Sequence, residues 1–204
     1  MAETLKVGVL ISGSGTNLQA IIDAIGNGLK AEVVLVVSSR PDAYGIQRAE
    51  AAGIPVLVMD KTKYEDVLQA DETIVDAFKA AGAEYVFMAG YMRKVTSVML
   101  AAFPNKGVNL HPALLPSFVG AHAIHDAFEF GVKVTGVTVH FALAEYDKGP
   151  IIAQRPVAVL EDDTEESLEE RIHEIEHQVF PEVLGWIADG KVSVDESGKV
   201  HVHE

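Results

Sequence analysis

The first half of the chain alternates short apolar runs with helix-like segments, and this alternation constrains the fold more than any other feature. The run Lys6–Ile11 is followed by Asn17–Ala24, in which apolar residues recur every three or four positions. The same order then repeats through Val33–Val37, the alanine-rich stretch Ile46–Ala52, Pro55–Val58, a helical segment from about Tyr64 to Ala81, and Tyr85–Met88. Strands that alternate with helices predict a parallel sheet wound by right-handed crossovers, as in a Rossmann fold.

The regular alternation of strand-like and helix-like segments ends after about Gly107. A brief run, Val108–Leu110, leads into a proline-containing loop, and two longer strand-like runs follow at Val134–Leu143 and Ile151–Val159. This pattern favours antiparallel pairing in the second half. We therefore predict the α/β class and one domain of 204 residues: a parallel, Rossmann-like half over about residues 1–107 and a mixed half over about residues 108–204.

The end of the chain carries helix-capping and turn signals. Asp163 and Thr164 are suited to cap a last helix that runs to about Ala188, with acidic residues in its first turn. Beyond it, the dipeptide Ser197-Gly198 indicates a turn, so residues 192–204 are expected to form a small edge hairpin.

Composition excludes several classes of protein. A chain that is 49% hydrophobic can bury one sizeable core, and its formal charge of −14 is opposite to that of nucleic-acid-binding proteins. The sequence contains no cysteine, which excludes disulfides, thiolate nucleophiles and thiolate-bound metals. Residues 1–6 lack the features of a signal peptide, so we expect a cytoplasmic protein with small-molecule partners, no nucleic acid and no membrane anchor.

A glycine-rich loop, Ser12-Gly-Ser-Gly-Thr-Asn17, lies between the first expected strand and the first expected helix. Backbone N–H groups and the helix dipole at such a place suit a phosphate. Leu18 stands where the dinucleotide fingerprint has its third glycine, and the loop has no Gly-Lys-Ser/Thr. The loop therefore disfavours NAD and nucleotide triphosphates and favours a phosphate monoester, although a tight turn alone would also require glycine.

Asn109 and His111 are a second candidate site. Pro112 restricts His111 to extended geometry, so both side chains should project to one side at a strand end. An asparagine amide is a neutral donor for an oxyanion, and a protonated histidine donates and then relays a proton. Asp147, in a turn after a later strand, would favour the protonated histidine if the fold brings it close. Each residue alone also has an ordinary structural explanation.

Five motifs in this order resemble the phosphoribosylglycinamide formyltransferase family: Ile11–Leu18, Met88–Arg93, Asn109–Pro116, Thr135–Phe141 and Asp147–Ile152. The resemblance spans nearly the whole chain. It implies transfer of a formyl group from 10-formyltetrahydrofolate, as cosubstrate and without a metal, to the glycinamide amine of a phosphoribosyl acceptor in purine synthesis. The implied intermediate is tetrahedral and not covalently bound to the enzyme.

The resemblance also implies roles for individual residues. Asn109, His111 and Asp147 would be catalytic. The acceptor would be bound by Gly15, Thr16, Asn17 and Glu176, and His122 is a secondary candidate near the site. The folate would be bound by Met92, Arg93, Lys94, Val95, Leu143, Ala144, Glu145 and Tyr146, together with Asn109 and Asp147.

Other readings of the sequence remain open. His173-Glu-Ile-Glu-His177 matches the His-Glu-x-x-His pattern of zinc proteases, but catalytic zinc needs a third ligand that the sequence does not clearly supply. Ile172, Glu176, Val179 and Val183 form one helical stripe, so Glu176 interrupts an apolar face. The functional alternatives are formylation of an initiator tRNA or amino sugar, hydrolysis of formylfolate, and a non-catalytic phosphate-binding module.

Overall fold

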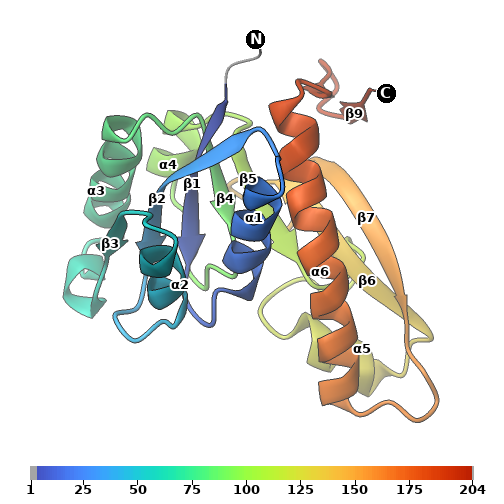
Figure 1. The fold of residues 1–204 in the computed structure, drawn as a ribbon. Coiled ribbons are helices and arrows are strands. Elements are labelled where there is room, and N and C mark those ends of the chain that lie inside the picture. Colours follow the sequence, from blue (N-terminus) through green and yellow to red (C-terminus); the bar gives the residue numbers. More distant parts are fainter. Residues whose placement is uncertain (1–3, 204) are drawn as a thin grey trace. The chain divides into compact units, whose positions relative to one another are not determined.

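The computed structural model describes residues 4–203. Their contacts gather into two compact units, one ending at Val108 and the other beginning at Asn109. The first unit alternates strands and helices (Figure 1). In chain order its elements are β1 (Leu5–Ile11), α1 (Thr16–Gly26), β2 (Ala31–Ser38), α2 (Gly45–Ala51), β3 (Val56–Val58), the 3-10 helix η1 (Lys61–Tyr64), α3 (Val67–Ala80), β4 (Tyr85–Met88), α4 (Ser97–Ala102) and the start of β5 (Gly107–His111).

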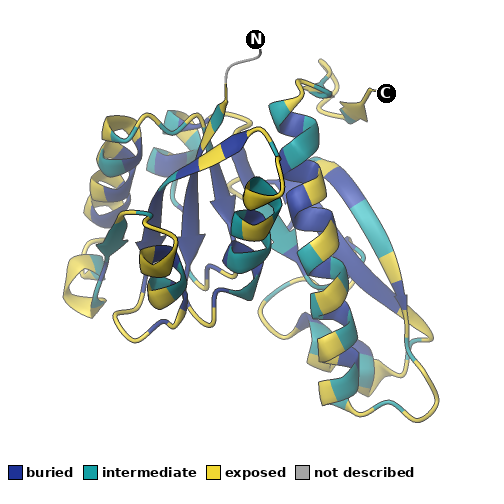
Figure 2. Ribbon diagram, viewed as in Figure 1, coloured by how far each residue is buried: buried dark blue, intermediate teal, exposed yellow. Residues whose placement is uncertain are grey.

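The strands of the first unit are parallel. β1 pairs with β2 on one side and β4 on the other, and β2 pairs with β3. Because right-handed crossovers carry the chain outward from β1 to β3 and then back to β4, α1 and α2 cover one face and α3 and α4 the other (Figure 1). Strands β1, β2 and β4 are therefore mostly buried and the edge strand β3 is half-buried, while the outer faces of the helices are exposed (Figure 2).

The second unit contains an antiparallel pair covered by a long helix. Its elements after β5 are α5 (Ala123–Phe130), β6 (Val134–Phe141), β7 (Ile151–Ala158), α6 (Glu165–Ala188), β8 (Val192–Val194) and β9 (Val200–Val202). The register of β6 against β7 shifts between Val139 and His140, so that Ile152 is an extra residue on β7. Such bulges re-aim neighbouring side chains. The strand order of the large sheet is β3-β2-β1-β4-β5-β6-β7, and the division between the units falls within β5.

α6 begins at a capping box. The Thr164 side chain accepts from the Ser167 backbone N–H, and the Ser167 side chain accepts from that of Thr164. Asp163 adds a bidentate ion pair with Arg171, with N–O distances of 2.9 and 2.7 Å. The helix then buries the predicted stripe, including Glu176, which is 5% exposed.

The α/β class, with a parallel first half and a mixed second half, is confirmed, but some element boundaries differ. The helix expected from Tyr64 is a 3-10 turn followed by α3, because the Asp66 side chain accepts from the Leu68 and Gln69 N–H groups and starts a new helix there. α4 was not predicted. The expected edge hairpin forms a two-stranded sheet of its own, β8-β9, separate from the large sheet. No helix in the described part of the chain is both long and apolar enough to cross a bilayer.

Candidate functional site

The glycine loop of the first unit connects β1 to α1 and requires glycine at position 15. Gly15 has a φ of 71°, in the left-handed region. A Cβ atom there would lie 2.5 Å from the Cα of Gly45, and the Gly45 N–H donates to the Gly13 carbonyl at 3.1 Å. The loop is therefore packed closely against the start of α2, and no larger residue fits at position 15.

Ser12 connects the glycine loop to the predicted folate segment 92–95. Its buried hydroxyl oxygen accepts from the Met92 N–H at 2.8 Å and lies 2.6 Å from the Ser39 hydroxyl. Both contacts lie at the carboxyl ends of parallel strands, where open α/β sheets bind ligands. The structure thus brings two of the predicted binding segments together within the first unit.

The segment 92–95 is held by aromatic and polar contacts. The Arg93 guanidinium lies 3.6 Å from the centroid of the Tyr64 ring, and the Tyr64 hydroxyl lies 2.8 Å from that of Tyr91. Burial strongly raises the pKa of Tyr91, so its hydroxyl stays neutral. At the end of the segment, the Thr96 N–H donates to the buried Asp71 carboxylate at 2.6 Å. These contacts fix the backbone while the Met92 side chain remains 69% exposed.

The three predicted catalytic residues lie in the second unit and are brought together around a fourth residue, His140. His111 Nδ1 lies 3.5 Å from Asp147 Oδ2, and both side chains are almost fully buried. Asn109 Nδ2 lies 3.1 Å from His140 Nε2, which in turn is 3.8 Å from Asp147 Oδ1. The result is one cluster of a half-buried amide with two imidazoles and a carboxylate that are buried.

His140 was not among the residues predicted from the sequence. Burial lowers the pKa of its imidazole, which favours the neutral form. Its Nδ1 faces the Phe141 carbonyl at 2.9 Å, so the single proton lies on Nδ1 and Nε2 accepts from the Asn109 amide. This assignment leaves one N–H of Asn109 for a ligand. The sequence feature that could have identified His140 is that it is a lone histidine in the otherwise apolar end of the motif Thr135–Phe141.

Two backbone positions at the histidine–aspartate pair are strained, one in Asp147 itself and one in Phe118. Phe118 and Asp147 have φ angles of 51° and 54°, which are uncommon for residues other than glycine. The Phe118 carbonyl lies 2.8 Å from His111 Nε2, and the Gly120 N–H donates to Asp147 Oδ2 at 2.9 Å. Both nitrogens of His111 therefore face oxygen atoms, and only a doubly protonated imidazolium donates to both.

The segment that follows His111 is fixed by hydrogen bonds to two polar side chains, Thr138 and Gln154. The Thr138 hydroxyl donates to the Ala113 carbonyl at 2.6 Å and accepts from the Leu115 N–H at 3.1 Å. Gln154 donates to the Leu115 carbonyl and to Thr138, both at 3.0 Å. The segment that follows His111 is thereby anchored to β6 and β7.

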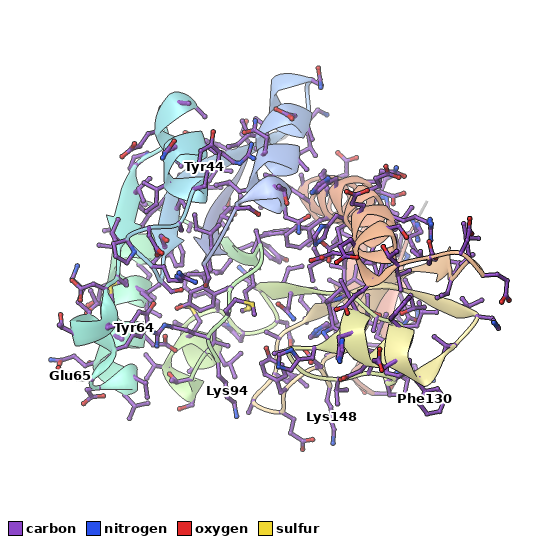
Figure 3. The ribbon with its side chains drawn as sticks, turned by 90° about the horizontal axis from the view of Figure 1, so that it is seen from below. Tyr44, Tyr64, Glu65, Lys94, Phe130 and Lys148 are labelled. Carbon is purple, nitrogen blue, oxygen red and sulfur yellow. The ribbon has the colours of Figure 1, made fainter. Side chains whose placement is uncertain are left out.

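The other predicted site residues of the second unit lie at the start of α5, on α6 and in the loop between β6 and β7. Glu176 is buried on α6, with His173 Nε2 4.0 Å from its carboxylate. His122 is exposed at the start of α5. The predicted folate segment 143–146 lies between β6 and β7, in a loop from which Lys148 extends (Figure 3), and Leu143 and Tyr146 are 44% and 50% exposed.

The histidines of the zinc-like motif pack on each other. The rings of His173 and His177 stack with centroids 6.3 Å apart. Within residues 4–203 no group of three or more histidine, cysteine, aspartate or glutamate side chains is arranged to hold a metal ion.

The side chains of the cluster determine which reaction it can support. Asn109 offers an oriented N–H to a developing oxyanion, protonated His111 can offer a second N–H, and Asp147 supplies a negative charge beside the imidazole. Low exposure strengthens these interactions relative to water. The cluster suits addition to a carbonyl carbon followed by proton transfer.

Comparisons with known proteins identify the family of the chain. A family model described as formyl transferase matches residues 5–184. The chain is 39% identical to phosphoribosylglycinamide formyltransferase of Bacillus subtilis, over 88% of this chain and 92% of the relative. The corresponding protein of Haemophilus influenzae is 37% identical, over 94% of this chain and 91% of the relative.

A longer relative and a solved structure extend the match. The chain is 43% identical to the trifunctional purine biosynthetic protein adenosine-3 of Gallus gallus over 96% of its own length, but it spans only 20% of that protein. The crystal structure of glycinamide ribonucleotide transformylase 1 from Symbiobacterium toebii superposes with a TM-score of 0.96 at 45% identity, covering 100% of this chain and 96% of the other. The chain therefore belongs to the formyl transferase family, in the group of the phosphoribosylglycinamide formyltransferases.

Proposed function

We propose that this protein is a cytoplasmic enzyme that transfers the formyl group of 10-formyltetrahydrofolate to the glycinamide amine of phosphoribosylglycinamide, without nucleic-acid or membrane partners. The observation that carries the proposal is the cluster of half-buried Asn109 with buried His111 and Asp147, ordered by His140. A chain in this family that only bound ligand would have no need of an oriented amide donor beside a histidine–aspartate pair.

The proposed binding sites for the acceptor and the folate are assigned to residues of each unit in turn. In the first unit, the glycine loop would hold the acceptor phosphate through Gly15, Thr16 and Asn17 at the start of α1. Met92 in the first unit, and Leu143 and Tyr146 in the second, expose apolar side chains in the segments assigned to the folate. Flat apolar ligands such as a pterin ring bind against surfaces of this kind. Glu176 is assigned to the glycinamide end of the acceptor.

The proposed mechanism is direct transfer. The acceptor nitrogen attacks the formyl carbon, forming a C–N bond and an oxyanion that accepts hydrogen bonds from Asn109 and from protonated His111. The acceptor nitrogen then gives up a proton, which a water held by Asp147 passes to N10 of the folate. Cleavage of the bond from carbon to N10 then releases tetrahydrofolate, which keeps the transferred proton on N10, and the formylated acceptor.

The contact between His111 and Phe118 bears on this mechanism. His111 Nε2 is bonded to the Phe118 carbonyl at 2.8 Å, and the same nitrogen cannot simultaneously donate in full to an oxyanion. Phe118 is also strained at its φ of 51°, a conformation that costs on the order of 1–3 kcal/mol in general. We propose that substrate binding exchanges the Phe118 carbonyl for the oxyanion.

The test is an assay with three acceptors. The purified protein is mixed with 10-formyltetrahydrofolate and phosphoribosylglycinamide, initiator tRNA or water alone, and release of tetrahydrofolate is followed. We expect turnover with phosphoribosylglycinamide. Turnover with either of the others, or none with any, would contradict the proposal.

Asn109→Ala and His111→Ala should each lower kcat by roughly 10²- to 10³-fold, the usual effect of removing one oxyanion donor. His125→Ala is the matched control, because His125 is an exposed histidine that contacts Glu165. Circular dichroism establishes that the variants are folded. Near-normal kcat in either cluster variant would remove that residue from the mechanism.

A further inference from the structure

The glycine loop proposed to bind phosphate has no basic side chain. Residues 12–17 contain neither lysine nor arginine, and the chain carries a formal charge of −14. A phosphate monoester carries nearly two negative charges at neutral pH. Binding it in such a protein depends on how well the backbone N–H groups are oriented and on any nearby cation.

α2 supplies that cation and contacts the loop directly. Arg48 Nε donates to the Ser14 carbonyl at 2.9 Å, and its Nη1 donates to Gln19 Oε1 at 3.3 Å. The guanidinium also lies 5.1 Å from the centroid of the Tyr44 ring, and Tyr44 lies beside α2 (Figure 3). The arginine is thus held in place by a backbone carbonyl, an amide and an aromatic ring.

These contacts determine the direction of two successive N–H groups. In a planar trans peptide the C=O of one residue points opposite to the N–H of the next. Arg48 binds the carbonyl of Ser14, and the Gly45 N–H binds that of Gly13. The N–H groups of Ser14 and Gly15 therefore point away from α2, and neither donates a hydrogen bond within residues 4–203.

We infer that Arg48 is a positioning residue of the acceptor-phosphate subsite. It holds the Ser14 carbonyl so that the Gly15 N–H faces the phosphate, and it adds a positive charge behind the loop. The inference rests on the proposed function, in which this loop binds phosphate. Arg48 acts through the loop, on the side of it opposite to the ligand.

The kinetic test separates acceptor binding from chemistry. Arg48→Met should raise KM for phosphoribosylglycinamide by roughly ten-fold, as expected for losing hydrogen bonds to a charged group. It should leave KM for 10-formyltetrahydrofolate and kcat at saturating acceptor within about two-fold. Arg48→Lys, which keeps the charge and one donor, should recover part of the loss. A change in kcat with KM unaltered would overturn the inference.

Arg40→Met is the matched control, because it removes the same charge from the same unit. The Arg40 side chain is 61% exposed and pairs with Asp42. It should leave both KM values near wild type. An equal rise of the acceptor KM in both variants would show a general charge effect and overturn the positioning role.

Inorganic phosphate provides a readout that does not require turnover. Titrating it into the full-length wild-type protein should shift the amide NMR signals of Ser14 and Gly15, and Arg48→Met should weaken that binding roughly ten-fold. Equal phosphate affinity in the two proteins, or no shift in the wild type, would refute the inference even if formyl transfer is observed. Weakened phosphate binding in a protein that transfers no formyl group would support the inference and refute the proposed function. If Arg48→Met does not fold, the same comparison is made with Arg48→Lys.

Discussion

His140 shows how burial assigns a role to a single residue. Its lowered pKa keeps the imidazole neutral, and the Nδ1 proton is directed at the Phe141 carbonyl. Asn109 depends on this tautomer, because only an unprotonated Nε2 accepts from its amide. The orientation of the proposed oxyanion donor is therefore set by a residue on a different strand.

The same pKa shift predicts a pH dependence of stability. An unfolded histidine titrates near about pH 6.5, so below that pH the unfolded chain binds a proton that folded His140 resists. The free energy of unfolding should therefore fall as pH drops from about 6.5 toward the lower pKa of the folded state. His140→Gln should flatten this part of the profile, as measured by urea denaturation between about pH 5 and pH 7.5.

Exposed His122 provides the control for this measurement. His122→Gln should keep the slope of the wild type. A profile for His140→Gln that runs parallel to the wild type would show that His140 does not resist protonation.

The sequence identified part of this site. Asn109 and His111 could be paired because strand alternation and Pro112 place them on one side. Asp147 could be joined to them only through the family resemblance, since nothing local sets its distance. His140 was missed because a histidine in an apolar strand is usually a core residue, and its role depends on the bulge between β6 and β7.

At the scale of elements, α6 depends on its first turn. The capping box of Thr164 and Ser167 satisfies backbone N–H groups that would otherwise have no partner. Thr164→Ala should lower the free energy of unfolding by about 1 kcal/mol, measured by urea denaturation. Thr73→Ala is the control, because Thr73 is exposed in α3 and its hydroxyl donates to the Gln69 carbonyl of the same helix. A larger loss for Thr73→Ala would contradict the capping role.

Some helices and strands could be predicted from the sequence more accurately than others. Strands β1, β2 and β4 are covered on both faces, so their apolar runs were unambiguous. The six residues of α4 are too few to show a helical period. The start of α3 was placed too early because the 3-10 turn ends at Tyr64 and α3 begins only after the cap at Asp66.

At the scale of the whole molecule, the excess of negative charge should make stability depend on salt. The chain has 30 acidic and 16 basic side chains, so many carboxylates repel one another without a cationic partner. Exposed pairs such as Lys133–Glu161 contribute little by comparison. Raising NaCl from about 10 to about 200 mM at pH 8 should therefore raise Tm, because screening weakens the repulsion.

The same series of NaCl concentrations, measured near the isoelectric point, is the internal control. At about pH 5, close to the pI of 4.9, the net charge is small and Tm should change little with NaCl. Chloride is preferred to sulfate, which stabilises proteins by exclusion from their surface. A Tm that falls with NaCl at pH 8 would mean that attractive pairs dominate.

The extra residue on β7 decides what a deletion in this strand would change. Ile152 is unpaired, whereas His140 pairs with Ile151 and Val139 with Ala153, so deleting Ile152 would make these pairs consecutive and remove the bulge. The pairing of Gln154 with Thr138 would be kept, but His140 would lose the local bend that aims its side chain. Shortening β7 by this residue should therefore act on the orientation of His140 and leave the register of the strand unchanged. Changes of length should be tolerated best at the turn around Gly198, which lies in the separate two-stranded sheet.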